Sequence, residues 1–142
     1  MKQMDVALDP MAGCSPTIQF DLPWPSKDLS PNARIHHMAH YRAKKAFRET
    51  CYWTTAQAGV RLGQTPYRLD LVFFAPDARR RDCDNLLASM KSGLDGMAQA
   101  LGVDDSRFDP VCVSMSTEDF NRKGFVRVIL TPHFDFDPQD KD

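Results

Sequence analysis

Hydrophobic and polar positions follow two different periods along the chain. Alternating or continuous apolar runs predict strands at 17–22, 67–75, 111–116 and 125–130. Apolar residues three and four positions apart predict helices over 38–59 and 85–101, and Gly102 is a natural stop for the second helix. The order β-α-β-α-β-β predicts a single α+β domain in which two helices cover a mixed four-stranded sheet.

The strands predicted at 67–75, 111–116 and 125–130 suggest how the sheet is arranged. The first of them becomes wholly apolar from Leu71 onward, which is typical of a central strand. The run Asn121 to Gly124, between the last two strands, has the residue types of a tight turn. We therefore expect the last two strands to form a hairpin.

The middle of the chain is basic and its ends are acidic. The net charge is −1, yet residues 1–25 carry −2 and residues 133–142 carry −3, so residues 26–132 carry +4. We expect a flexible N-terminal arm over 1–15, a folded domain over 16–132 and an acidic C-terminal tail over 133–142. A basic domain is compatible with a phosphate-bearing partner but does not identify one.

Composition narrows the cellular setting. No apolar run approaches the roughly 20 residues of a membrane span, and no signal-peptide pattern precedes the first strand, so we expect a cytoplasmic protein that does not enter a membrane. The four cysteines, Cys14, Cys51, Cys83 and Cys112, form no CxxC pair. Reduced thiols without a metal or redox role are therefore expected.

The most unusual stretch of the chain places three cations directly before two carboxylates. Arg79, Arg80 and Arg81 precede Asp82 and Asp84 where the second strand gives way to the second helix. Two residues apart in extended backbone, both carboxylates point to one side and can share a hard cation. An Asp can instead cap the helix. Capping accounts for one of the two acids but not for both.

A second acidic pair, Asp104 and Asp105, follows the end of the same helix. Alone, such a pair is typical of a solvated turn. Two acidic clusters that bracket one helix suggest a metal site, because magnesium-dependent phosphodiester hydrolysis needs clustered carboxylates to hold the ion. Neighbouring arginines would bind the phosphate through charge-assisted hydrogen bonds.

The run Arg80 to Leu86, followed about twenty residues later by Asp104-Asp105, resembles the hallmark of the RusA-like Holliday-junction resolvases of phages and prophages. Leu22 to Ser26 and Ser30 to Asn32 resemble that family's opening strand and loop, so the resemblance covers about residues 17–131. It implies a homodimeric endonuclease that uses Mg²⁺, for which Mn²⁺ can substitute. Its substrate in DNA recombination and repair would be branched DNA, a four-way junction whose opposed strands it nicks.

The resemblance also implies roles for particular residues. Asp82, Asp84 and Asp105 match the family's catalytic, metal-binding carboxylates. A functional lysine expected four residues after Asp84 is replaced here by Ala88. Lys91, roughly two helical turns after Asp84 on the same face, is a candidate to replace it, with a solvated surface lysine as the alternative.

Basic residues in two places are candidates for DNA binding. One group is Arg79, Arg80 and Arg81. The other lies along the first helix and its approach, and its members are Arg34, Arg42, Lys44, Lys45 and Arg48. They cannot all share one helical face, so a DNA surface that includes Arg42 and Lys45 and an ordinary solvated face both remain open. We expect His36, His37 and His40 to be structural or DNA-contacting. We expect Tyr41, Tyr52 and Trp53 to be core or helix-packing residues rather than platforms for base stacking.

The predicted helix length bears on how the acids meet. If the helix is unbroken from 85 to 101, its ends are roughly 25 Å apart at about 1.5 Å per residue. Asp84 and Asp105 of one chain then cannot bind one ion, so either the helix is shorter or Asp105 completes the site of a twofold partner. Two rival functions also remain: a non-catalytic binder of branched DNA, and a module whose acids bind calcium structurally.

Overall fold

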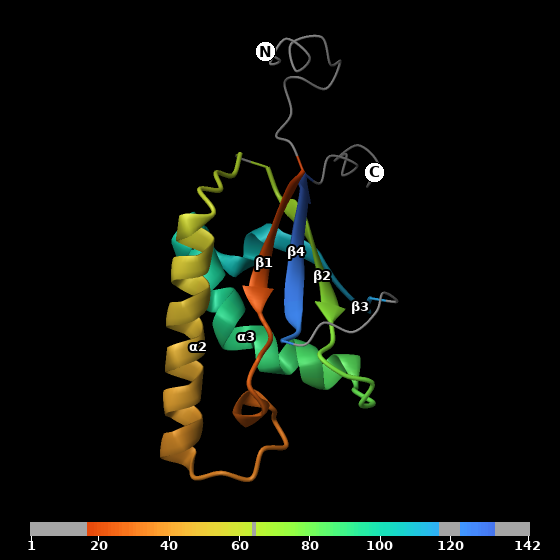
Figure 1. Cartoon of the computed structure of the whole chain (residues 1–142). Coiled ribbons are helices and arrows are strands. Elements are labelled where there is room, and N and C mark those ends of the chain that lie inside the picture. The colour runs from red at the N-terminus through yellow and green to blue at the C-terminus, as the bar shows by residue number, and fades with distance from the viewer. Residues whose placement is uncertain (1–16, 64, 117–122, 133–142) are drawn as a thin grey trace, which may run out of the picture.

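The computed structural model describes residues 17–63, 65–116 and 123–132. The arm and tail expected at 1–15 and 133–142 lie outside the described residues. The strands are β1 (Ile18–Pro23), β2 (Tyr67–Phe74), β3 (Phe108–Met115) and β4 (Phe125–Pro132). The helices are α2 (His37–Gln57) and α3 (Cys83–Leu101), with short 3-10 turns η1 (Lys27–Leu29) and η2 (Asp105–Arg107). The predicted order is confirmed, and with it the single α+β domain (Figure 1).

The four strands form one mixed sheet in the order β1-β4-β2-β3. β2 is parallel to β3 and antiparallel to β4, and β1 is antiparallel to β4. The expectation that the last two strands form a hairpin was wrong, because β2 lies between them. α3 is the crossover that returns the chain parallel to β2 on one side. The chain then passes to the other side of β2, which leaves the most apolar strand in the interior of the sheet as predicted.

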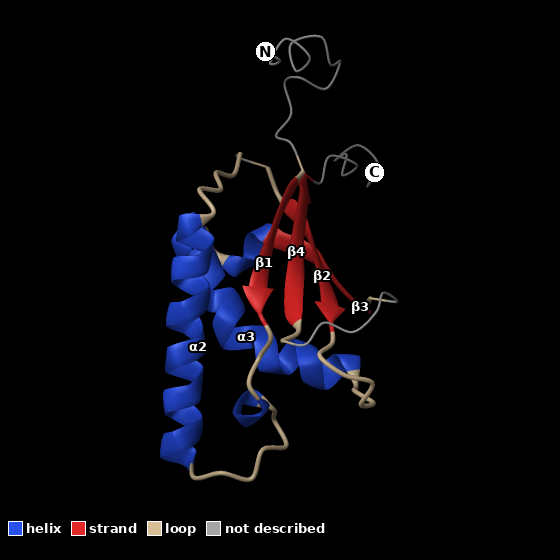
Figure 2. Ribbon diagram, viewed as in Figure 1, coloured by secondary structure: helices blue, strands red, loops and turns tan. Residues whose placement is uncertain are grey.

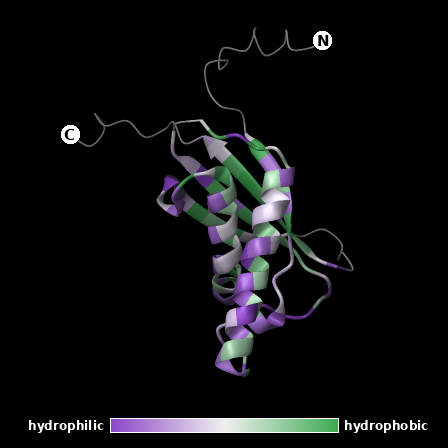
Figure 3. Cartoon of the chain, turned by 90° about the vertical axis from the view of Figure 1, so that its left-hand side faces the viewer, coloured by the Kyte–Doolittle hydropathy of each residue, from purple (hydrophilic) through white to green (hydrophobic). Residues whose placement is uncertain are grey.

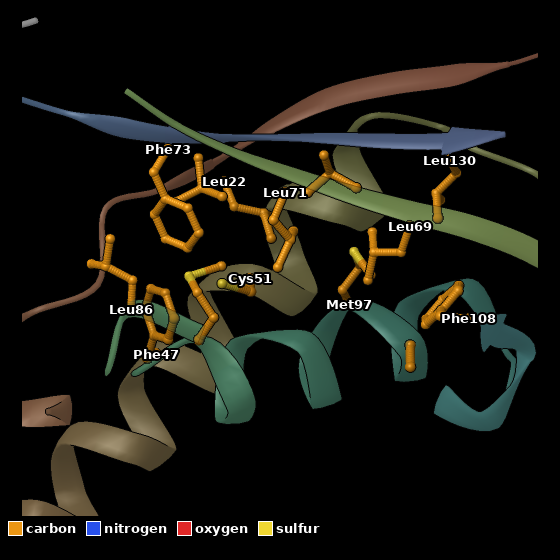
Figure 4. Close-up of a cluster of buried hydrophobic side chains, with 14 of the residues drawn as sticks. Leu22, Phe47, Cys51, Leu69, Leu71, Phe73, Leu86, Met97, Phe108 and Leu130 are labelled. Atoms are coloured by element: carbon orange, nitrogen blue, oxygen red, sulfur yellow. The ribbon is translucent and has the colours of Figure 1, made fainter. Parts of the chain in front are cut away.

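Both helices pack on one face of this sheet (Figure 2). Alternate residues of β2 and β4 face them, and these are fully buried: Tyr67, Leu69, Leu71, Phe73, Val126, Val128 and Leu130. Figure 4 shows how side chains of the sheet meet Phe47 and Cys51 of α2 and Met97 of α3. Burial of each large apolar side chain contributes about 1.5–3 kcal/mol, so this layer holds the sheet and the start of α3 in fixed relation.

Two glycines of α3 allow α2 to approach closely. A Cβ atom on Gly96 would lie 2.1 Å from the carbonyl oxygen of Arg48, and one on Gly93 would lie 2.5 Å from Cε2 of Phe47. Glycines lower helix propensity by about 1 kcal/mol each relative to alanine, yet α3 is continuous. The helix-to-helix contact therefore explains why the sequence keeps these residues.

Gly96→Ala is expected to destabilise the fold by about 2 kcal/mol or more, because the methyl group meets backbone that cannot rotate away. Gly93→Ala is the matched comparison. Its methyl group meets the ring of Phe47, which can shift, so the loss should be smaller. Urea denaturation of both variants measures the free energy of unfolding. Equal values for the two variants would contradict this account of the contact.

α2 buries only one face, along Phe47, Cys51 and Thr55. Its other face is mostly polar and open (Figure 3). Tyr41 is 56% and Trp53 61% exposed, so neither side chain lies in the core. The ring of Trp53 packs edge-on against that of Tyr52 on the same helix. The 21-residue helix meets the sheet and α3 on one side, and nothing described covers the other.

Three of the four cysteines lie in the described part of the chain. Cys51, Cys83 and Cys112 form no disulfide, and Cys14 lies outside the described residues. Burial raises the pKa of the Cys51 thiol to about 12, which leaves it protonated and unreactive. Within the described ranges, neither α2 nor α3 combines the length and the apolarity that crossing a bilayer requires.

Candidate functional site

A cleft of 620 Å³ opens where β1 and β2 end and α3 begins. We call it the Asp82 cleft. Its charged lining residues are Lys27, Asp77, Arg79, Arg80, Arg81, Asp82 and Lys123. Trp24, Ser26, Ser30, Asn85 and Ser89 complete most of the wall. Five cations against two carboxylates make this cleft suited to an anion.

Asp82 caps α3. Its backbone is extended, with φ −99° and ψ 127°, and its Oδ1 accepts a hydrogen bond of 3.2 Å from the N–H of Asp84. α3 begins at Cys83, two residues earlier than expected, so the premise that Asp82 and Asp84 are spaced along extended backbone was wrong. Asp84 lies in the first helical turn and is exposed. The capping alternative therefore describes Asp82, whose carboxylate also lines the cleft.

Arg81 fastens the loop before α3. One of its terminal nitrogens donates to Oδ1 of Asp77 at 2.7 Å, and the other donates to the backbone oxygens of Asp77 and Arg79. Its guanidinium also lies over the ring of Trp24, 5.2 Å from the centroid, and its side chain is only 15% exposed. Arg81 thus acts within the chain first, whereas the sequence predicted a DNA contact.

Arg79 and Arg80 are exposed beside Asp82 in the same cleft. The backbone N–H of Arg79 donates to Asp77 at 2.9 Å. That bond, together with the side-chain hydrogen bond from Arg81, lowers the pKa of Asp77. Asp77 therefore stays ionised as the anchor of the loop, and the loop turns Arg79 and Arg80 toward solvent.

Asp105 begins η2, on the far side of α3. Asp104 caps this turn by accepting hydrogen bonds from the N–H and the hydroxyl of Ser106, which lowers the pKa of Asp104. Arg107 fixes the turn to the loop before β2 by donating to the carbonyl oxygens of Gly63 at 2.8 Å and Thr65 at 3.1 Å. Asp105 itself remains exposed.

The two acidic clusters lie at opposite ends of the sheet. Phe108, directly after η2, pairs with Tyr67 at the start of β2, whereas Asp82 follows the end of that strand (Figure 1). α3 is unbroken over 19 residues, which at about 1.5 Å per residue is about 28 Å. In the described part of the chain, no three His, Cys, Asp or Glu side chains gather closely enough to hold a metal ion. One chain therefore does not bring Asp82 and Asp84 to Asp105.

The residues at the start of α3 nevertheless fit a magnesium ion in part. Mg²⁺ keeps several water ligands and is commonly held by one or two carboxylates together with substrate phosphate oxygens. Asp82 lines the cleft beside the exposed Arg79 and Arg80, and the exposed carboxylate of Asp84 lies two residues further along, outside the lining of the cleft. Asp77 is the other carboxylate of the cleft and is bound by Arg81, so Asp105 could join Asp82 and Asp84 only from another chain.

The remaining candidates lie away from the Asp82 cleft. Lys91 and Ala88 line a separate groove between α2 and α3. Arg42 and Lys45 are exposed on α2, five and two residues before buried Phe47. At about 100° per residue they lie roughly opposite the buried face, so the structure does not bring them to Asp82.

The histidines take structural positions. Nδ1 of His36 accepts a hydrogen bond of 3.1 Å from the N–H of Met38 and so caps α2, and the ring of His36 stacks on that of His37. Nδ1 of His40 donates to the backbone oxygen of Asp28 at 2.9 Å. The structural alternative for these residues therefore agrees with the contacts found.

Sequence reasoning did not single out several residues of the cleft, and Lys27 and Ser89 are two of them. Lys27 belongs to the short turn η1, which lies in none of the predicted helices or strands. Ser26 caps that turn by accepting a hydrogen bond from the N–H of Asp28, and the Ser-Lys-Asp order was the available signal for it. Ser89 gave no signal, because a serine in the middle of a helix is ordinary.

Comparison with known proteins identifies a relative but no activity. An uncharacterized protein of Xylella fastidiosa is 43% identical to this chain over 111 residues, which is 75% of the chain and 72% of the relative. No protein-family model matches the chain. The chemistry of the cleft must therefore be argued from its own residues.

Proposed function

The chain belongs to the same family as the uncharacterized Xylella fastidiosa protein, and from the Asp82 cleft we propose that it is a magnesium-dependent endodeoxyribonuclease that resolves four-way DNA junctions as a homodimer. The observation that carries the proposal is the cleft that combines the carboxylate of Asp82 with the exposed cations Arg79 and Arg80. The resemblance of the Arg80–Leu86 run to the RusA-like resolvases points to the same chemistry.

Each group has a part in this proposal. Arg79 and Arg80 bind the non-bridging oxygens of the phosphate by charge-assisted hydrogen bonds. Asp82 and Asp84 would hold Mg²⁺, which when bound activates a water and neutralises charge on the leaving oxygen. The cap on α3 fixes the carboxylate of Asp82, and the Arg81 contacts fix the loop that carries the arginines. One water is consumed, and one bond between phosphorus and a bridging oxygen is broken.

Incubation of the full chain with synthetic four-way junctions tests the proposal. Paired nicks that require Mg²⁺ or Mn²⁺, with little cutting of linear duplex of the same sequence, are the expected result. Binding without nicking would favour the rival function, a non-catalytic binder of branched DNA. Calcium binding with no DNA binding would favour the structural calcium module.

Junction binding should depend steeply on salt, because each phosphate contact releases condensed counterions. Replacing both Arg79 and Arg80 by Gln should lower the slope of log affinity against log salt by about 2. Fluorescence anisotropy at several NaCl concentrations measures it. Arg81→Gln, in contrast, should also reduce stability, since Arg81 holds the loop. A junction affinity that does not change as the salt concentration rises would contradict the DNA-binding part of the proposal.

A catalytic role for Lys91 is a prediction. It rests on the RusA-like resemblance, which implies a lysine at the position of Ala88. Lys91→Ala should lower the nicking rate more than the junction affinity. The reason is that a positioned amine stabilises the phosphate in the transition state more than in the ground-state complex. Single-turnover cleavage and anisotropy on the same junction separate the two effects. Equal losses of rate and affinity, or no loss of either, would show that Lys91 is an ordinary solvated lysine.

A further inference from the structure

A groove of 410 Å³ lies between α2 and α3, bordered by Leu29 and Pro31. We call it the α2–α3 groove. Its charged lining residues are Lys44, Arg48, Lys91 and Asp95, and His40 lines it as well. Lys44, Arg48 and Lys91 form no ion pair within ranges 17–63, 65–116 and 123–132. Three cations and one carboxylate leave the groove positive, which attracts an anion.

Ser92 supplies an independent observation. It lines the groove, is only 9% exposed, and its buried hydroxyl has no hydrogen-bond partner among the described residues. Ser89, one turn earlier, donates to the backbone oxygen of Asn85 at 2.9 Å, so a serine of α3 can satisfy itself within the helix. A buried hydroxyl without a partner costs free energy. Rotation about χ1, which takes a serine between staggered rotamers, would let this unsatisfied hydroxyl donate to a ligand oxygen in the groove that Ser92 lines.

The walls of the groove are fixed. The close contact of Gly96 with the backbone of Arg48 sets the spacing of the two helices. The hydrogen bond from Nδ1 of His40 to Asp28 ties α2 to η1. A site whose walls need not be ordered on binding loses less conformational entropy. The groove is thus preformed for its ligand.

We propose that the α2–α3 groove binds a backbone phosphate of the DNA, with Lys44 and Arg48 as the cations and the Ser92 hydroxyl as a donor. This inference rests on the proposed function. Ser89 lines both this groove and the Asp82 cleft, so the two hollows are neighbours. One DNA strand can therefore place one phosphate at Asp82 and a nearby phosphate between the helices, which aligns the strand for cutting.

The test compares three variants of the full chain in junction binding. Lys44→Gln with Arg48→Gln should weaken affinity about tenfold and lower the salt slope by about 2. Ser92→Ala should weaken affinity about threefold to tenfold without loss of thermal stability, because it removes a hydroxyl that makes no bond in the free protein. The matched control is Arg61→Gln, since Arg61 is exposed on the loop after α2 and should change the slope less than the double variant.

The outcomes separate this inference from the proposed function. If the wild type nicks junctions and the groove variants keep its affinity and salt slope, the groove inference alone is overturned. The groove inference is also overturned if the double variant Arg42→Gln with Lys45→Gln accounts for the whole loss of junction affinity. It is overturned as well if Ser92→Ala lowers thermal stability and junction affinity together. Failure of the wild type to bind junctions at all overturns both proposals.

Titration with inorganic phosphate alone distinguishes a free anion from DNA as the source of the phosphate. NMR shifts at Ser92 and Lys44 that the double variant abolishes, combined with its weaker junction binding, support the assignment. Shifts with unchanged junction affinity would assign the groove to a small anion and overturn the DNA contact.

Discussion

Asp82→Asn should abolish nicking, by about a hundredfold or more, while junction binding stays equal or becomes stronger. Loss of a metal-ligand charge removes several kcal/mol of transition-state stabilisation, and each 1.36 kcal/mol is tenfold in rate. Loss of the same charge also removes repulsion toward the phosphate. Single-turnover cleavage in Mg²⁺ and anisotropy in the absence of metal measure the two effects.

The structure makes this substitution unusually clean. Asp82 caps α3, and Asn is about as good a helix cap as Asp, so the fold should be kept. Asp82→Ala is the control that removes the cap as well and should cost about 1 kcal/mol of stability. Cleavage by Asp82→Asn at the wild-type rate would disprove the assignment of Asp82 to the metal.

A mixture of Asp82→Asn and Asp105→Asn subunits should recover nicking that neither variant shows alone. The two clusters are separated by the whole of α3, about 28 Å at about 1.5 Å per residue, so a complete site would combine Asp82 of one chain with Asp105 of its partner. A mixed dimer then collects both lesions in one site and leaves the other intact. Purified mixed dimers with two different tags, assayed for single-strand nicks, measure the recovery.

The reciprocal mixture is the matched control. Wild-type subunits paired with subunits that carry both substitutions would, under a shared site, have one lesion in each site and lose activity. Under a site within one chain, that same mixed dimer would keep one intact site and still nick. The two mixtures therefore give opposite results under the two arrangements, and activity in the wrong one would refute the shared site.

Much of the fold followed from periodicity, because helices and strands bury one face each. The stripe from Leu86 to Leu101 predicted α3, and the apolar run after Leu71 predicted an interior strand. Strand neighbours did not follow. A turn-like run such as Asn121 to Gly124 favours a hairpin locally, but which strand pairs with β2 depends on contacts distant in sequence that no local pattern carries.

The sequence pointed to the junction of the second strand and second helix, where the structure has the Asp82 cleft, but the contacts of its residues needed coordinates. The sequence alone does not distinguish three adjacent arginines. The structure does, because Arg81 contacts Asp77 and Trp24 whereas Arg79 and Arg80 are exposed. Likewise Ser92 reads as an ordinary helix residue until its burial and missing hydrogen bond are seen. Whether a polar group is satisfied is a property of its surroundings.

The place of β4 in the sheet bears on how the chain is made. β4 lies between β1 and β2, and its Arg127 bonds to Asp21 of β1, 106 residues earlier. Until β4 has emerged from the ribosome, β1 has no strand to pair with, and β2 lacks one of its two neighbouring strands. The sheet can therefore close only after all four strands have been synthesised, and such non-local pairing slows folding. Nascent chains halted before β4 should be the most dependent on chaperones.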